Sequence, residues 1–394
     1  MLRKLFKKSM YYFATLVGGK ILTAIVFILL ARILQPEKFG LITYFITVVQ
    51  LMSVLADFGL RSWYQKMMAK KDNLVLFSGL LTWRLIFYGV SVMVLLSLSL
   101  ITDWLNISLL PPIFIALLFE ALISVSDAYY LAQQKSIFLG YKLIARNLLL
   151  FTSLLLIKSP ADYQRFFLIY NLALIGVLIF YFPLKALDWQ WLTTSKKLPK
   201  IKTALPYASI DGLGIIYGRA DGLMIENIIN SAALGIYGAA YRYLDAFNLL
   251  PQALFHNLFP IAAKKNGINF PQVKKMVGVM TLLGLGVAAM VFFLSDWLTI
   301  MLMGEQYAAA GVILRYFSVV IVMFFFNAPL NTVIQSSDQV KRYVPKLGLI
   351  VAINIILNLI LLPKIGLMGA VYTMIICEMI LIIFNCGLIK KIYR

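Results

Sequence analysis

The sequence has few charged residues, almost no histidine and almost no cysteine. Charged residues make up 13% of its 394 positions, about half the share found in soluble globular proteins, whereas 62% are hydrophobic. One histidine and two cysteines, Cys377 and Cys386, provide neither a metal cluster of His and Cys nor a disulfide framework. A water-soluble core could not enclose this much apolar surface. The composition therefore indicates a membrane protein.

Apolar runs of spanning length recur along the chain. A helix needs about 20 apolar residues to cross a hydrocarbon core of about 30 Å, and its backbone groups must pair within the helix. We therefore predict an all-α integral membrane protein with about twelve transmembrane helices. The first run has no small-residue cleavage site, so we interpret it as an uncleaved span. The predicted spans are 10–34, 40–62, 74–101, 109–133, 141–157, 166–184, 205–229, 232–260, 274–301, 307–336, 343–362 and 367–389.

Basic residues are distributed unevenly between these spans. If the twelve spans alternate in direction, 25 of the 36 Lys and Arg fall in the connections on one side and five in those on the other. This asymmetry follows the positive-inside rule and predicts that both termini are cytoplasmic. It also explains the net charge of +20 without nucleic acid as a partner, because the basic residues are spread over short loops between spans.

Similar segments at near-equal shifts indicate an internal duplication. ILQPEKFGLITYF from Ile33 resembles IINSAALGIYGAA from Ile228, and Gly40 matches Gly235 at a shift of 195 residues. Farther along the chain, TDWLNI resembles SDWLTI at a shift of 193 residues. Chance similarity in a biased composition is the alternative, and the agreement of the two shifts argues against it.

The duplication predicts the domain organisation. An N-terminal six-helix bundle covers 1–184, a cytoplasmic linker covers 185–203, and a C-terminal six-helix bundle covers 204–394. Six helices is an even number, so both bundles insert in the same orientation and are related by a pseudo-two-fold axis along the membrane normal. We expect a polar cavity between them.

Ionisable residues deep inside the predicted spans are the candidate functional residues. A charge at a helix centre costs about 2.5–3.5 kcal/mol on insertion scales, so it marks function by default. Structural ion pairs between helices are the alternative for each residue taken alone. The candidates are the cations Lys20, Arg84, Arg219, Arg242 and Arg315 and the acids Glu120, Asp221, Asp245 and Glu378.

Several other charges within the spans have simpler interpretations. Asp57 precedes Arg61 by four residues, which predicts a local ion pair. Lys142 and Arg146 lie near the start of a span and are expected to reach the membrane interface with their charged ends.

The candidate cations predict an anionic passenger. The planar guanidinium group matches phosphate oxygens, and lysine adds a point charge. We predict that the five cations bind this anion. The four acids balance the cavity and couple transport to H⁺ or Na⁺, with no other cofactor or metal.

Three segments resemble a known family. LARILQPEKFGLITYF at the first turn, residues 218–260 and NLILLPKIGLMGAVYTMII from Asn358 look like polysaccharide and O-antigen flippases of the multidrug/oligosaccharidyl-lipid/polysaccharide exporter superfamily. The first turn reads Gln-Pro-Glu where this family usually has Gly-Pro-Glu. Lys20 falls where relatives that flip the peptidoglycan precursor carry an arginine, but no second cation follows it here.

The resemblance implies two six-helix bundles in a V around a central cavity that opens alternately to the two leaflets. It implies that undecaprenyl-diphosphate-linked oligosaccharide, an O-antigen or related repeat unit, moves to the outer leaflet of a bacterial inner membrane. Membrane lipids, a polysaccharide polymerase and chain-length machinery are the other expected partners.

Two alternatives stay open. A membrane glycan polymerase or ligase usually carries a large outer loop, whereas the outer connections predicted here are short. A drug/cation antiporter shares the superfamily fold but is expected to have an acid-dominated pocket.

Overall fold

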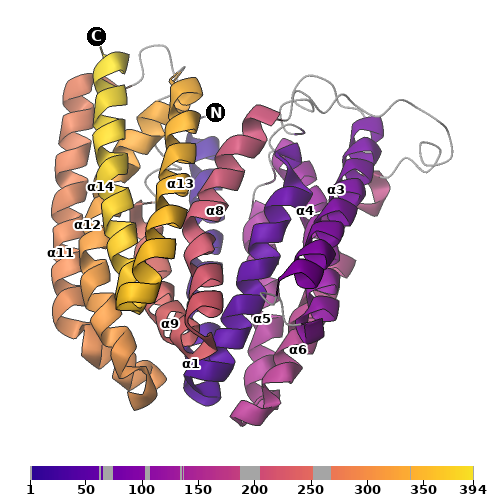
Figure 1. The fold of residues 1–394 in the computed structure, drawn as a ribbon. Coiled ribbons are helices and arrows are strands. Elements are labelled where there is room, and N and C mark those ends of the chain that lie inside the picture. The colour runs from indigo at the N-terminus through magenta and orange to yellow at the C-terminus, as the bar shows by residue number, and fades with distance from the viewer. Residues whose placement is uncertain are drawn as a thin grey trace. The chain divides into compact units, whose positions relative to one another are not determined.

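The computed structural model describes residues 2–61, 64, 74–102, 107–133, 135, 137–186, 205–251, 268–337 and 339–393, and every regular element within them is a helix (Figure 1). The all-α prediction is confirmed. The α-helices are α1 (Leu2–Asp57), α3 (Leu74–Ile101), α4 (Leu110–Ala132), α5 (Ile137–Leu156), α6 (Tyr163–Tyr181), α8 (Leu205–Ile228), α9 (Ser231–Phe247), α11 (Phe270–Met303), α12 (Ala308–Ser336), α13 (Val340–Ile365) and α14 (Leu367–Ile392). Short 3-10 turns lie at Ile107–Leu109, Pro160–Asp162, Leu184–Ala186 and Glu305–Tyr307.

Most of these helices are apolar enough to cross a bilayer. Among the described residues, nine helical stretches of 20 to 44 residues meet that requirement. The longest, Ala14–Asp57, covers most of the first two predicted spans, 10–34 and 40–62. The helical geometry of α1 is interrupted at Gln35, whose φ of 62° and ψ of 164° are not helical, so the two predicted spans are separated there. The number of twelve spans and the cytoplasmic termini stay predictions.

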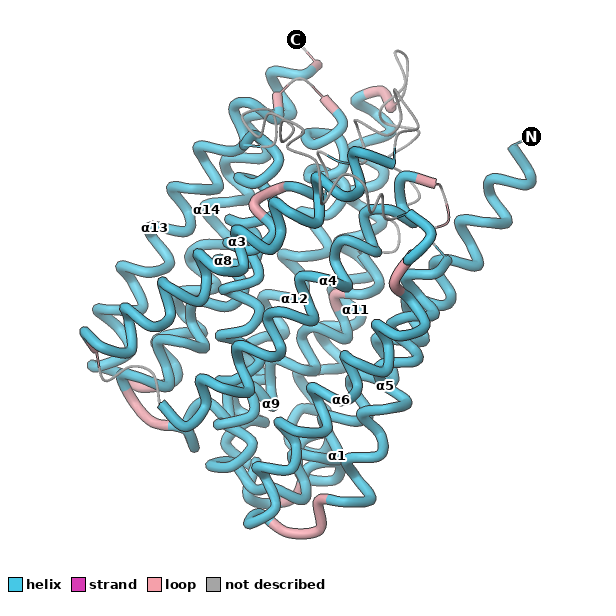
Figure 2. The backbone as a smooth tube through the Cα atoms, turned by 90° about the vertical axis from the view of Figure 1, so that its right-hand side faces the viewer, coloured by secondary structure: helices cyan, strands magenta, loops and turns pink. Residues whose placement is uncertain are grey.

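The first compact unit comprises Met1–Val26 and Tyr44–Arg219. In this unit α6 packs against α4 and α5, and α3 packs against α4 (Figure 2). The first part of α1 contacts α5, where the side-chain amide of Asn147 donates to the carbonyl oxygen of Gly19 at 2.9 Å. The linker predicted at 185–203 lies almost entirely outside the described residues, so the predicted domain boundaries stay a prediction.

The second compact unit comprises Phe27–Thr43 and Ala220–Arg394. Its central helix is α12, which packs against α11, α14 and α9, while α13 packs against α14. The middle of α1 belongs to this unit. It is attached there by the hydroxyl of Tyr307, which donates to the carbonyl oxygen of Ala31 at 3.0 Å.

Within the second unit the turn of α1 crosses α9 at a pair of glycines. A Cβ atom at Gly40 would lie 1.7 Å from the carbonyl oxygen of Ser231, and one at Gly235 would lie 1.9 Å from that of Pro36. The two contacts are reciprocal, because Gly235 lies 195 residues after Gly40 and Ser231 lies 195 residues after Pro36. The two similar segments therefore meet at this crossing, whereas the duplication itself stays a prediction.

Candidate functional site

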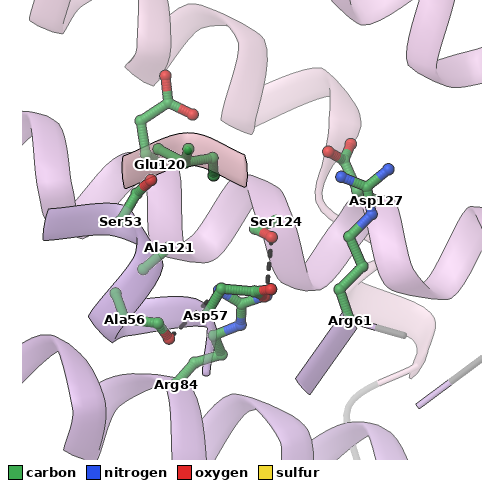
Figure 3. A pocket seen from close by; sticks show the side chains of 10 residues that line it. Ser53, Ala56, Asp57, Arg61, Arg84, Glu120, Ala121, Ser124 and Asp127 are labelled. Atoms are coloured by element: carbon green, nitrogen blue, oxygen red, sulfur yellow. Dashed lines mark hydrogen bonds and ion pairs between the residues drawn. The ribbon is translucent and has the colours of Figure 1, made fainter. Parts of the chain in front are cut away.

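A cavity of about 510 Å³ lies within the first unit, and we call it the Arg84 cavity (Figure 3). A volume of this size is typical of small-molecule sites. Arg84, the lining residue on α3, lies ten residues from the start of that helix, which corresponds to about 15 Å along its axis. The lining residues are Ser53, Ala56, Asp57 and Arg61 at the end of α1 and just beyond it, Arg84 on α3, Glu120, Ala121, Ser124 and Asp127 on α4, and Ile215 on α8.

Arg84 is the most deeply buried charge of this cavity, with 1% of its surface exposed. Its guanidinium group forms an ion pair with Asp57. It also donates to the Ser124 hydroxyl at 2.8 Å and to the carbonyl oxygen of Ala56 at 3.3 Å. Partners on two other helices thus hold this cation, because a buried guanidinium without a carboxylate would carry an uncompensated charge.

The predicted local pair between Asp57 and Arg61 is therefore wrong. An i, i+4 pair needs a continuous helix, but α1 ends at Asp57. Phe58 and Gly59, with φ of 41° and 70° respectively, leave the helical region. The chain turns there, so Arg61 does not lie one helical turn from Asp57, and Asp57 pairs with Arg84 instead.

Two further ion pairs join α4 to α5. Lys142 lies 2.7 Å from a carboxylate oxygen of Asp127, and Arg146 lies 3.2 Å from one of Glu120. The prediction that Lys142 and Arg146 extend to the membrane interface stays a prediction, and it did not include these partners. Each meets a carboxylate on the neighbouring helix, where the two charges offset each other's burial cost.

Helix α6 completes this arrangement with two tyrosines. The Tyr181 hydroxyl donates to Asp127 at 2.9 Å, and the Tyr170 hydroxyl donates to Glu120 at 3.3 Å. Each carboxylate thus accepts hydrogen bonds from a cation and from a phenol. Satisfying several oxygen lone pairs in this way makes a buried ion pair affordable in a low-dielectric interior.

The cavity lining holds two cations and three carboxylates, and two further cations outside the lining, Lys142 and Arg146, pair with two of these carboxylates. Arg84, Lys142 and Arg146 pair with Asp57, Asp127 and Glu120 respectively. Arg61 also lines the cavity, but it forms no ion pair or hydrogen bond with any residue that the structure describes. Among the described residues, this arrangement therefore has one positive charge without a paired carboxylate, and this charge can attract an anion.

Sequence reasoning found only part of this site. Of the predicted site residues, the structure brings Arg84 and Glu120 to the cavity. Lys20 and Arg219 lie in the same unit, are half-buried and have partners of their own.

The predicted site did not include Asp127, Lys142 and Arg146, although their spacing in the sequence carries a signal. Glu120 and Asp127 on α4 are seven residues apart, and Lys142 and Arg146 on α5 are four apart. Each spacing places the two residues on one face of their helix. Two acids on one face of a helix, followed by two cations on one face of the next helix, form a pattern that predicts ion pairs between the two helices.

The remaining predicted residues lie in the second unit. The side chain of Asp221 accepts from the Tyr237 hydroxyl and from the backbone NH of Gly222. The Arg242 guanidinium lies 4.0 Å from the centre of the Phe27 ring. Asp245 is half-buried and has a partner of its own.

Arg315 is held by an ion pair at the contact of α11 and α12. Its guanidinium pairs with Asp296 and donates to the Ser295 hydroxyl at 3.4 Å. The side chain of Arg315 is 39% exposed and that of Asp296 49%. This geometry matches a structural pair between helices, the alternative that the sequence left open.

Glu378 belongs to a network of amides between α12 and α14. It is 2% exposed and accepts from the side-chain amide of Asn327 at 3.0 Å. Asn385 donates to the side-chain oxygens of Asn327 and Asn331, both at 3.0 Å. Neutral amides therefore dominate this polar cluster, whereas ion pairs dominate the Arg84 cavity. The predicted roles of these second-unit residues stay predictions.

The chain is similar in sequence to proteins of polysaccharide biosynthesis. Residues 5–266 match the family described as "Polysaccharide biosynthesis protein". The "Capsular polysaccharide biosynthesis protein CapF" of Staphylococcus aureus is 24% identical over 195 residues, which are 48% of this chain and 49% of that protein. The chain thus spans about half the length of this curated relative.

Solved structures share the fold at low sequence identity. "Lipid II flippase MurJ, inward closed conformation" superposes with a TM-score of 0.74 at 12% identity, covering 97% of this chain and 87% of the other. A multidrug resistance MATE family transporter of the MOP superfamily, in an inward-facing conformation, has a TM-score of 0.68 at 12% identity, covering 95% of each chain. The chain therefore has the fold of multi-pass membrane transporters.

Proposed function

We propose, because the chain belongs to the polysaccharide biosynthesis protein family, that it is a flippase for a lipid-linked glycan. The proposed substrate is an undecaprenyl-diphosphate-linked oligosaccharide, the repeat unit of O-antigen or of a related surface polysaccharide. The flippase moves it from the cytoplasmic to the outer leaflet of a bacterial inner membrane by alternating access coupled to H⁺ or Na⁺. The translocated oligosaccharide is then used by a polysaccharide polymerase and its chain-length machinery.

The observation that carries this proposal is the charge balance of the Arg84 cavity. Three carboxylates there are each matched by a cation, and Arg61 adds one more positive charge. A cavity with a net positive charge favours a diphosphate over a cationic drug, because an anion gains attraction without displacing an existing pair.

The competing function is export of hydrophobic cations, which the structural likeness to multidrug transporters favours. The two functions are separated by reconstituting the purified full chain in vesicles. We expect a fluorescent lipid diphosphate that carries a short glycan to move between leaflets, and we expect a hydrophobic cation such as ethidium not to be exported.

The control is the Arg84→Ala variant, which leaves the half-buried Asp57 without its cation and removes one of the two positive charges that line the cavity. We expect little leaflet movement of the lipid diphosphate with this variant. Transport of ethidium by the unaltered chain, together with no movement of the lipid diphosphate, would overturn the proposed function.

A further inference from the structure

We propose that Arg61 is the residue of this chain that contacts a phosphate group of the substrate, at the Arg84 cavity. This inference rests on the proposed function and adds to it the place where the anion is bound. The sequence had assigned Arg61 only to a local pair with Asp57, which the structure replaces with the Asp57–Arg84 pair.

The first argument is the availability of the guanidinium group. Arg84 is buried and already engaged by Asp57, Ser124 and Ala56. For Arg84 to bind an anion, it would have to give up the carboxylate of Asp57, and losing the partner of a buried cation is strongly destabilising. Arg61 gives up no partner among the described residues, and it is half-buried rather than enclosed.

The second argument is that the rest of the site is arranged to tolerate an anion. Three carboxylates in one cavity would repel a phosphate if they were not neutralised. Each is paired, and the distances of the Lys142–Asp127 and Arg146–Glu120 pairs, 2.7 and 3.2 Å, are those of direct contacts. The pairs therefore cancel the local negative charge and leave the field of Arg61 to act on the cavity.

The third argument is the set of donors around the cavity. The Ser124 oxygen accepts a hydrogen bond from Arg84 at 2.8 Å, and its own hydroxyl proton has no acceptor among the described residues. That proton is available to a phosphate oxygen. Figure 3 shows Ser124 and Arg61 on the same cavity, with Arg61 on the side of Asp127. The planar guanidinium group of Arg61 and the hydroxyl group of Ser124 can together donate hydrogen bonds to several oxygens of one phosphate group.

The test is a binding measurement on the purified full chain in detergent, by calorimetry, with inorganic pyrophosphate and a short-chain prenyl diphosphate as probes. We expect Arg61→Ala to weaken binding of both probes by roughly tenfold or more, the loss typical of a hydrogen bond to a charged group. Arg61→Lys keeps the charge without the planar fork, so we expect it to weaken binding less.

The matched control is Arg165→Ala. Arg165 is 60% exposed in its side chain, pairs with Asp162 three residues earlier, and lies outside the cavity lining. We expect this variant to bind both probes like the unaltered chain. The thermal unfolding midpoint of Arg61→Ala should also be close to that of the unaltered chain, because no internal ion pair is lost among the described residues.

The outcomes separate this inference from the proposed function. If the unaltered chain binds both probes and Arg61→Ala binds them equally well, the assignment of Arg61 is wrong while the flippase proposal stands. If the unaltered chain binds neither probe, both are overturned. Vesicles of phosphatidylglycerol that compete as strongly as the prenyl diphosphate would show a general lipid-phosphate site, and this would overturn the assignment to the substrate.

Discussion

The two turns at Ile33 and Ile228 share a backbone crossing but are built from different side chains. Asn230 has an extended backbone with φ of 177°, and its side chain caps α9 by accepting from the backbone NH of Ala233 at 2.8 Å. The residue 195 positions earlier is Gln35, which has a φ of 62° and precedes Pro36. One turn thus uses a side-chain cap, whereas the other relies on proline to begin its helix.

The difference shows which feature the crossing requires. Both turns keep a glycine where the partner's backbone approaches, at Gly40 and Gly235. At Gly238, an added Cβ atom would lie 2.9 Å from a methyl carbon of Thr43, and these two positions are themselves 195 residues apart. Close backbone approach is therefore common to both turns, and the manner of starting the helix is not.

The largest effect is expected from filling the crossing. Gly40→Ala places a methyl group against the carbonyl oxygen of Ser231, and Gly235→Ala places one against that of Pro36. Backbone atoms cannot move aside unless the helices separate, so we expect each variant to lose stability at or above the upper end of the roughly 1–3 kcal/mol typical of overpacking. The thermal unfolding midpoint in detergent is the measurement.

The matched control is Gly286→Ala in α11, where nothing lies within 4 Å of the added methyl group. We expect that variant to be as stable as the unaltered chain or more so, by up to about 1 kcal/mol from helix propensity. The double variant at Gly40 and Gly235 should lose less than the sum of the two, because either methyl group opens the same crossing. Equal midpoints for Gly40→Ala and Gly286→Ala would contradict the reciprocal contact.

The same two turns show how far the sequence could lead. The apolar runs predicted α3 at its observed bounds, 74–101, because spanning length and hydrophobicity are local properties. The match of Gly40 with Gly235 was also visible, but a repeat does not say that its two copies touch. The partner of Arg84 could not be predicted either, since it depends on α1 ending at Asp57 and on the positive φ of Phe58, which no periodicity marks.

A smaller effect should distinguish the two helix starts. Asn230→Ala removes the oxygen that accepts from the backbone NH of Ala233, and loss of such a cap typically costs about 1 kcal/mol. Gln35→Ala removes an exposed side chain from the equivalent position and should cost much less. Asn230→Asp keeps an acceptor and is the control. Equal losses of thermal midpoint for the two alanine variants would mean that the cap does not stabilise α9.

The smallest effect is expected at Gln35, and its sign is opposite. A φ of 62° with a ψ of 164° lies in a region adopted almost only by glycine, where other residues carry about 1–3 kcal/mol of strain. Gln35→Gly relieves that strain but gives the unfolded chain more freedom, which offsets about 0.5–1 kcal/mol of the gain. We therefore expect a small rise in the thermal midpoint. Asn230 has no positive φ, so Asn230→Gly relieves no strain and should lower the thermal midpoint. A lower midpoint for both glycine variants would show that Gln35 is not strained and that the two turns differ only in their caps.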